Sequence, residues 1–228
     1  MEEVLFTPLP ASARHSYMNT MYYLCVHHSG PIGSSPYSSS QGLTLSRLNQ
    51  AHAARDFNES FLGYFVGYNF LVCPDGMIIQ TRAIGEETCA QKGHNFDTVS
   101  ICILGNFTTQ ENGLPVDVMP SAQKLAFLNL STNLIRGIVS KYEVITGTQM
   151  NINLSRVFPH RVLQPKHTEC YGNYYPDTWA RDEIAVRMRG ELNVLIASLL
   201  SLVERLKLFL APRSVGGSDY SCDGHTEI

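Results

Sequence analysis

Apolar and polar positions alternate along the chain in patterns that predict strands at three places. The run MYYLCVH at residues 21–27 is typical of a strand, and a loop rich in Ser, Gly and Pro follows it. VGYNFLVCPDGMIIQTR at residues 66–82 predicts a β-hairpin around a Cys-Pro-Asp-Gly turn. VSICIL at residues 99–104 is apolar and β-branched, which favours a buried central strand.

Helical spacing of apolar residues recurs in three further segments. Residues 43–55 form the first, and Pro120 opens the second, which we expect to run from Ser121 to about Tyr142. The third covers residues 183–210. The second helix has five apolar side chains available for one face, at Leu125, Leu128, Leu134, Ile135 and Ile138.

The order of these elements predicts an α/β domain with a mixed central β-sheet flanked by helices, followed by an added C-terminal helix. We expect the domain over residues 1–182, an amphipathic helix over residues 183–210 and a flexible tail over residues 211–228. NVLIASLLSLV within the helix is densely apolar, but charged residues from Glu204 onward make it too short for a membrane span. We expect this helix to pack on the domain, to self-associate with a second copy or to contact a membrane surface.

Composition and charge indicate a globular protein. Of 228 residues, 44% are hydrophobic and 16% are charged, and the formal net charge is -3, so nucleic acid is not expected as a partner. The first residues include two glutamates and no apolar run behind a basic start, which predicts cytoplasmic synthesis. The six cysteines have no tight paired spacing, and we expect them to be reduced unless the protein reaches an oxidising compartment.

Three residues could together hold a metal ion. A zinc ion in a hydrolase takes three protein ligands and leaves its fourth position for water, and His27, His160 and Cys170 could supply such a set. Neither HExxH nor CxxC occurs, so no simple spacing rule marks the site. From the residues alone, a zinc site and three ordinary polar side chains near strand ends both stay open.

Four groups of motifs, taken in order, resemble a known family. They are VHHSG at residues 26–30, the hairpin at residues 66–82, GHN with TVSICILGNF at residues 93–107, and PHR followed by TECYG at residues 159–172. Together they resemble the zinc-dependent N-acetylmuramoyl-L-alanine amidases of the type 2 family, which share their fold with peptidoglycan recognition proteins and amidase-type phage lysozymes. The resemblance covers roughly residues 20–182 and implies the same fold for this domain.

The resemblance implies roles for particular residues. The zinc ligands of the family correspond to His27, His160 and Cys170, whereas His28 is expected on the opposite face of its strand. Two further family positions correspond to Tyr68 and Thr168, which we expect to be catalytic donors to the developing oxyanion. His94 and Asn95 are polar loop residues near the expected cleft, and we expect them to contact the substrate.

The implied activity is zinc-dependent hydrolysis of the amide bond between N-acetylmuramic acid and L-alanine in peptidoglycan. Such an enzyme would act as a phage endolysin, released from the cytoplasm by a holin, or as another wall-lytic enzyme. A muropeptide-recycling amidase, a non-catalytic peptidoglycan-binding module and a regulatory interaction protein are the alternatives. Members that only bind peptidoglycan typically lack a ligand. The general base stays open among Tyr68, His167 and a substrate-linked water, and a shifted loop would also draw in Lys166.

The chain departs from the family pattern at three positions. Cys89-Ala90 stands where relatives often have His-Ala, which leaves fine substrate contacts undefined. Ser100 replaces a frequent glycine, and we expect this change to affect packing more than chemistry. Tyr171 stands where proline is usual after the cysteine.

Overall fold

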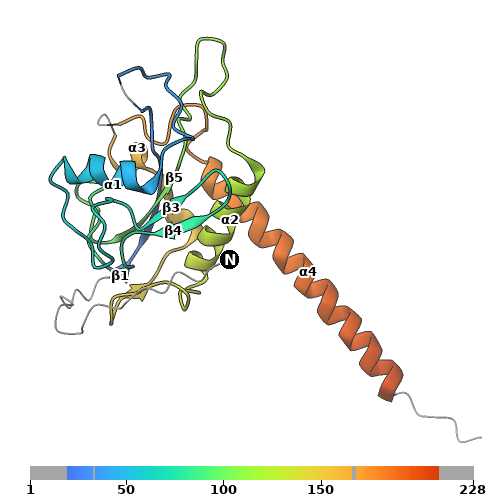
Figure 1. Ribbon diagram of the computed structural model, residues 1–228. Helices are drawn as coiled ribbons and strands as arrows, with labels where there is room; N and C mark the ends of the chain where they lie inside the picture. The colour runs from blue at the N-terminus through green and yellow to red at the C-terminus, as the bar shows by residue number, and fades with distance from the viewer. Residues whose placement is uncertain (1–19, 33, 166–167, 211–228) are drawn as a thin grey trace, which may run out of the picture. The chain divides into compact units, whose positions relative to one another are not determined.

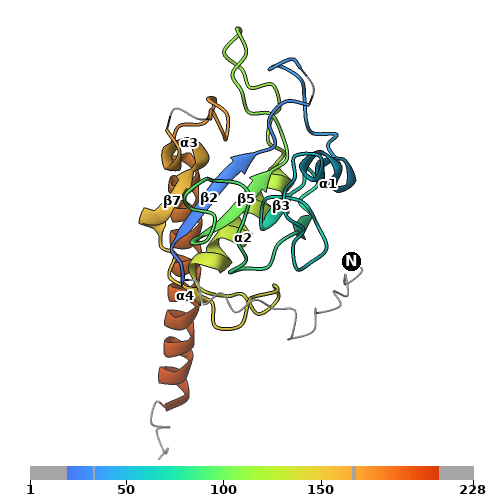
Figure 2. The same cartoon turned by 90° about the vertical axis from the view of Figure 1, so that its left-hand side faces the viewer.

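A mixed β-sheet of five strands forms the centre of the molecule in the computed structural model, which describes residues 20–32, 34–165 and 168–210. Across the sheet the strands are β4 (Ile78–Gln80), β3 (Phe70–Val72), β5 (Thr98–Ile103), β2 (Tyr23–His28) and β7 (Val157–Pro159). Parallel pairing joins β3 to β5, β5 to β2 and β2 to β7, whereas β3 and β4 are antiparallel, so the predicted mixed sheet is confirmed (Figures 1 and 2). A separate parallel pair joins β1 (Thr20–Met21) to β6 (Gln149–Met150).

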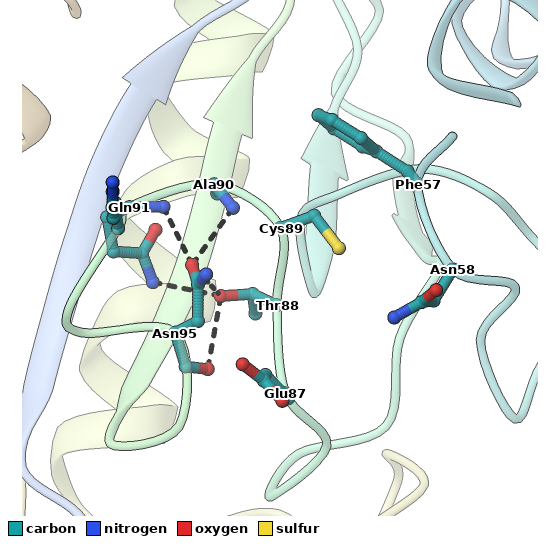
Figure 3. A pocket seen from close by; sticks show the side chains of 9 residues that line it. Phe57, Asn58, Glu87, Thr88, Cys89, Ala90, Gln91 and Asn95 are labelled. Carbon is teal, nitrogen blue, oxygen red and sulfur yellow. Dashed lines mark hydrogen bonds between the residues drawn. The ribbon is translucent and has the colours of Figure 1, made fainter. Parts of the chain in front are cut away.

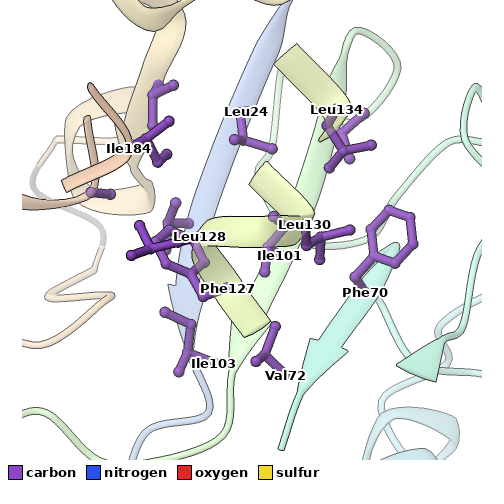
Figure 4. Close-up of a cluster of buried hydrophobic side chains, with 14 of the residues drawn as sticks. Leu24, Phe70, Val72, Ile101, Ile103, Phe127, Leu128, Leu130, Leu134 and Ile184 are labelled. Carbon is purple, nitrogen blue, oxygen red and sulfur yellow. The ribbon is translucent and has the colours of Figure 1, made fainter. Parts of the chain in front are cut away.

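The main hydrophobic core lies between one face of this sheet and α2 (Ser121–Ile135). Alternate residues of the central strands point into it, because successive strand side chains face opposite ways. Figure 4 shows Leu24, Ile101 and Ile103 from the strands beside Phe127 and Leu130 from α2. Burial of these apolar side chains is the principal force that holds the helix on the sheet.

The second predicted helix is shorter than expected, and its buried face differs from the predicted one. The α2 helix ends at Ile135 rather than near Tyr142, because Gly137 adopts a φ of 69° that an α-helix cannot continue through. Leu125 and Ile138 are 49% and 47% exposed, so both predicted face positions are wrong.

The opposite face of the sheet is covered by α1 (Leu45–Ala53). Thr44 caps this helix, because its side chain accepts a hydrogen bond from the backbone N–H of Arg47. Leu48 from the helix packs in a second, smaller core with Val66 and Cys102. This second core supports the side of the sheet on which the candidate site lies.

The last helix, α4, runs from Trp179 to Leu210. Its first turns belong to the main compact unit, in which the Trp179 ring stacks on Phe127 at 5.6 Å between centroids and anchors the start of the helix. Residues from Arg189 onward form a second unit, in which the large apolar side chains that the structure describes are exposed. None of the described helices has the length and apolar character needed to cross a membrane. The predicted tail, residues 211–228, lies outside the described residues.

Truncation of Phe127 tests the main core. We expect Phe127→Ala to lower the free energy of unfolding by about 3–5 kcal/mol, because the change leaves a cavity beneath the sheet and removes the stack on Trp179. Leu125→Ala, on the exposed side of the same helix, is the matched control and should change it by less than about 0.5 kcal/mol. Chemical denaturation of both variants measures the difference, and equal losses would contradict the packing described here.

Candidate metal centre

Strand pairing brings two distant histidines together. The β2 and β7 strands run parallel, with Val26 opposite Pro159, so the next residues along each strand, His27 and His160, are neighbours at the same edge. A short 3-10 turn, η2 (Leu154–Arg156), precedes β7, and His160 is the first residue of α3 (His160–Leu163), which follows β7 directly. The two imidazole rings lie 4.7 Å apart between centroids.

A loop anchored by Arg161 carries the third residue, Cys170. The backbone N–H of Arg161 donates to the carbonyl of Cys170 at 2.8 Å, and its guanidinium donates to the carbonyls of Gly172 and Tyr175. The Arg161 side chain also forms an ion pair with Asp177 at 2.5 Å. Arg161 therefore ties the cysteine loop to the helix that begins with His160.

Gly172 allows this loop to approach the rest of the domain closely. Its φ is 85°, and a Cβ atom at this position would lie 2.3 Å from the carbonyl oxygen of Phe107. Only glycine combines that backbone conformation with that approach, so residue 172 helps to hold Cys170 against β2.

The three side chains lie close enough together to hold a metal ion. The candidate ligand atoms of His27, His160 and Cys170 all lie within 4.8 Å of one another. Nδ1 of His27 lies 3.6 Å from Sγ of Cys170. Tetrahedral coordination with ordinary zinc–nitrogen and zinc–sulfur bond lengths separates such atoms by about 3.6 Å. Two imidazoles and one thiol are also a donor set that zinc accepts.

Burial determines the protonation of these groups. It lowers the pKa of His27, which neighbouring His160 lowers further, and it also lowers the pKa of His160. Both rings are therefore neutral near pH 7 and have a free lone pair. Burial raises the pKa of the Cys170 thiol to about 12, against the opposing effects of the His28 N–H and of Arg161. A metal ion that binds this sulfur must displace its proton.

His28 has a different environment from His27. Its Nδ1 accepts a hydrogen bond from the backbone N–H of Phe107 at 3.2 Å, on the main-core side of the strand, as strand alternation predicts. Its backbone N–H donates to Sγ of Cys170 at 3.4 Å. His28 thus contributes its backbone, rather than its imidazole, to the ligand cluster.

A pocket of about 290 Å³ opens over the cluster, and its lining includes His160, Cys170, Tyr68 and Thr168. The Tyr68 ring lies 4.9 Å from that of His27, and burial raises the pKa of the phenol, which keeps its proton near neutral pH. The Thr168 hydroxyl oxygen accepts a hydrogen bond from the Cys170 N–H at 3.1 Å, which leaves its own proton available. The structure therefore brings the predicted catalytic residues to the predicted ligands.

The two predicted substrate contacts lie in the adjoining segment, residues 88–95, outside the lining just described. The side-chain oxygen of Asn95 accepts hydrogen bonds from the backbone N–H groups of Ala90 and Gln91, which stabilises the segment (Figure 3). The His94 ring packs edge-on against Tyr23 at 5.2 Å. Asn95 also lines a second pocket of about 360 Å³, which shares Phe57, Cys89 and Ala90 with the first.

Other residues of the site carried little signal in the sequence. His52 lines the pocket, and its Nδ1 accepts a hydrogen bond from the backbone N–H of Gly67. Burial lowers the pKa of His52 to about 4. Arg161 was marked only by its place in the PHR motif. Lys166 and His167, two alternatives considered for the loop, lie outside the described residues.

The sequence matches the N-acetylmuramoyl-L-alanine amidase family over residues 17–173, which is more than half of the chain and contains all three candidate ligands. The chain belongs to this family. The matched part of this amidase-family chain ends before α4 begins at Trp179.

Individual relatives are distant. Peptidoglycan-recognition protein SC2 of Drosophila melanogaster is 24% identical over 163 residues, which are 71% of this chain and 74% of that protein. The N-acetylmuramoyl-L-alanine amidase LysC from Clostridium intestinale URNW is 21% identical, with a TM-score of 0.47 over 83% of this chain and 95% of that chain. The Ph2119 endolysin from Thermus scotoductus MAT2119 bacteriophage Ph2119 is 17% identical, with a TM-score of 0.46 over 72% of this chain and 84% of that chain.

Removal of one imidazole tests the metal centre. We expect His160→Ala to retain less than one equivalent of zinc after dialysis, because two donors hold the ion far more weakly than three. His94→Ala removes an imidazole outside the ligand cluster and should keep the zinc content of the wild-type protein. Elemental analysis of the purified proteins measures the content, and stoichiometric zinc in His160→Ala would exclude His160 as a ligand.

Proposed function

We propose that this protein is a zinc-dependent N-acetylmuramoyl-L-alanine amidase that hydrolyses the bond between N-acetylmuramic acid and L-alanine in peptidoglycan. The observation that carries the proposal is the convergence of His27, His160 and Cys170 within 4.8 Å, beneath a pocket that Tyr68 and Thr168 also line. A complete ligand set favours hydrolysis over a module that only binds peptidoglycan. When bound, zinc supplies the Lewis acidity that activates water and polarises an amide carbonyl.

The chain's own residues provide the remaining parts of the reaction. An amide carbonyl under attack develops negative charge on its oxygen, and hydrogen-bond donors already in position stabilise that charge. The Tyr68 phenol retains its proton and is one such donor. The Thr168 hydroxyl is the second, since its oxygen accepts from the Cys170 N–H and the hydroxyl has its own proton to donate.

We propose an intact wall, rather than a free muropeptide, as the substrate, as for a phage endolysin or another wall-lytic enzyme released from the cytoplasm. The support is the second pocket, which shares three lining residues with the first and so extends the site along the segment 88–95. A longer site suits a polymer with groups on both sides of the cleaved bond. Turbidity loss on purified cell walls, beside the rate on soluble anhydromuropeptides, tests this choice, and a preference for the soluble substrate would favour the recycling enzyme.

Hydrolysis itself is tested through Tyr68. We expect Tyr68→Phe to lower kcat for muropeptide release about 100- to 1,000-fold while zinc content is unchanged, because the variant lacks the oxyanion donor but keeps the aromatic ring beside His27. Tyr64→Phe is the matched control, since Tyr64 packs against the smaller core and does not line the pocket. Stoichiometric zinc with no release of muropeptides by the wild-type protein would instead support the binding module.

We also propose that α4 self-associates with a second copy. Within the second unit, six of the exposed apolar residues recur at alternating intervals of three and four, which is the spacing of a coiled-coil seam, and Val194, Ile196, Leu200, Val203 and Leu210 are exposed beside them. A helix with such a face exposed gains stability when a partner covers it. Each residue of the stripe is at least 49% exposed, and the stripe comprises Leu192, Leu195, Leu199, Leu202, Leu206 and Phe209.

Light scattering of the full chain tests this association. We expect the wild-type protein to have the mass of a dimer, and the double variant Leu199→Lys with Leu202→Lys to be a monomer, because lysines cannot pack in the seam. Ala197→Lys with Ser201→Lys places the same charges off the stripe and should stay dimeric. A monomeric wild-type chain that sediments with lipid vesicles would instead favour membrane-surface contact.

A further inference from the structure

Both candidate ligand histidines are hydrogen-bonded by a glutamine side chain. Nε2 of His27 lies 3.2 Å from Oε1 of Gln91, and Nε2 of His160 lies 2.8 Å from Oε1 of Gln164. In a neutral imidazole one nitrogen carries the proton and the other has a lone pair, so the partner of Nε2 determines which nitrogen can bind a metal.

The amide of Gln91 has one orientation that satisfies its neighbours. Its Nε2 donates to the backbone carbonyl of His94 at 3.3 Å and to the hydroxyl of Thr88 at 3.0 Å. A carbonyl can only accept, so the NH₂ end must face His94 and the oxygen must face His27. The oxygen also accepts from the Ser100 hydroxyl at 2.8 Å. Figure 3 shows the Gln91 side chain bonded to Thr88 within this segment.

This orientation assigns the proton of His27. Because Oε1 of Gln91 has no proton, Nε2 of His27 must be the donor, and Nδ1 keeps its lone pair. Nδ1 is the atom that lies 3.6 Å from Sγ of Cys170. The lone pair therefore belongs to the nitrogen that faces the third ligand.

Gln164 arranges His160 in the same way. It follows His160 by four residues, one helical turn, and its Nε2 donates to the backbone carbonyl of Lys92 at 2.7 Å. The amide oxygen is thus directed to Nε2 of His160, which must donate, and Nδ1 of His160 retains the lone pair. Both glutamines are held by carbonyl groups of one segment, residues 88–95.

We propose that Gln91 and Gln164 are positioning residues that hold both ligand histidines in the Nε2–H tautomer, so that each Nδ1 is reserved for the metal. This inference rests on the proposed function in that it takes the cluster to be a metal site. Ser100, which stands where relatives often have glycine, belongs to the arrangement through its bond to Gln91, so its effect extends beyond the packing role expected from the sequence. Partners of this kind orient the ring and raise its affinity for a metal.

Zinc affinity of the full chain, measured by competition with a chromophoric chelator, tests the proposal. We expect Gln91→Leu and Gln164→Leu each to bind zinc about 10- to 100-fold more weakly than the wild-type protein. Gln91→Glu keeps an oxygen acceptor for His27 and should bind more tightly than Gln91→Leu. Gln123→Leu is the matched control, because Gln123 is an equally buried glutamine that bonds only the carbonyls of Val72 and Leu104 among the described residues. Its affinity should equal that of the wild-type protein.

A second measurement reads the tautomer directly. Long-range ¹H–¹⁵N spectra of the zinc-free protein at neutral pH should show His27 and His160 as Nε2–H tautomers, and the matching leucine variant should show a mixture at the affected ring. An Nδ1–H tautomer in the wild-type protein, or unchanged zinc affinity in both leucine variants, would overturn the proposal. If a leucine variant does not fold, the spectrum of the wild-type protein and the zinc affinity of Gln91→Glu still test the proposal. Expected tautomers together with weakened zinc binding in the leucine variants, in a protein that releases no muropeptides, would reject the proposed amidase activity alone.

Discussion

Parallel pairing of β2 with β7 is the constraint on which the candidate site depends. The register that sets Val26 opposite Pro159 makes His27 and His160 neighbours, although the sequence separates them widely. Pairing of β2 with β5 on its other side places Ser100 and Cys102 on the same face as His27, and these residues meet the segment 88–95 and the smaller core. A one-residue slip of β2 would exchange His27 for His28 and direct the wrong imidazole toward Cys170.

Much of the fold could be predicted from periodicity, because the central strands and the hairpin are bounded by clear turn signals. The end of α2 could not, since a single glycine with positive φ stops a helical pattern that continues beyond it. The buried face of α2 was also mispredicted at Leu125. The side that a helix buries depends on the sheet beneath it, and the helix's own spacing is compatible with more than one face.

The cluster of His27, His160 and Cys170 could be predicted only when the motifs were considered together. The β7 strand has three residues, too few for a strong strand signal, and its pairing with β2 is a long-range event that local patterns do not encode. Gln91 and Gln164 carried no signal, because a polar residue in a loop or at a helix end is common and its partner is defined by tertiary structure alone. Asn95 shows the converse: its place in the GHN motif suggested contact with substrate, and in the structure its oxygen organises the segment that holds both glutamines.

Because of Arg161, the distance between His160 and Cys170 does not depend on the length of the loop that joins them. Arg161 bonds to the backbone at residues 170, 172 and 175, and these bonds fix the position of Cys170 relative to His160. The residues that connect Arg161 to Cys170 take no part in them. Residues added between 164 and 169 would then cost little beyond loop-closure entropy, about 0.6 kcal/mol for each doubling of loop length. A longer or shorter interval between His160 and Cys170 would therefore leave the distance between these two candidate ligands largely unchanged.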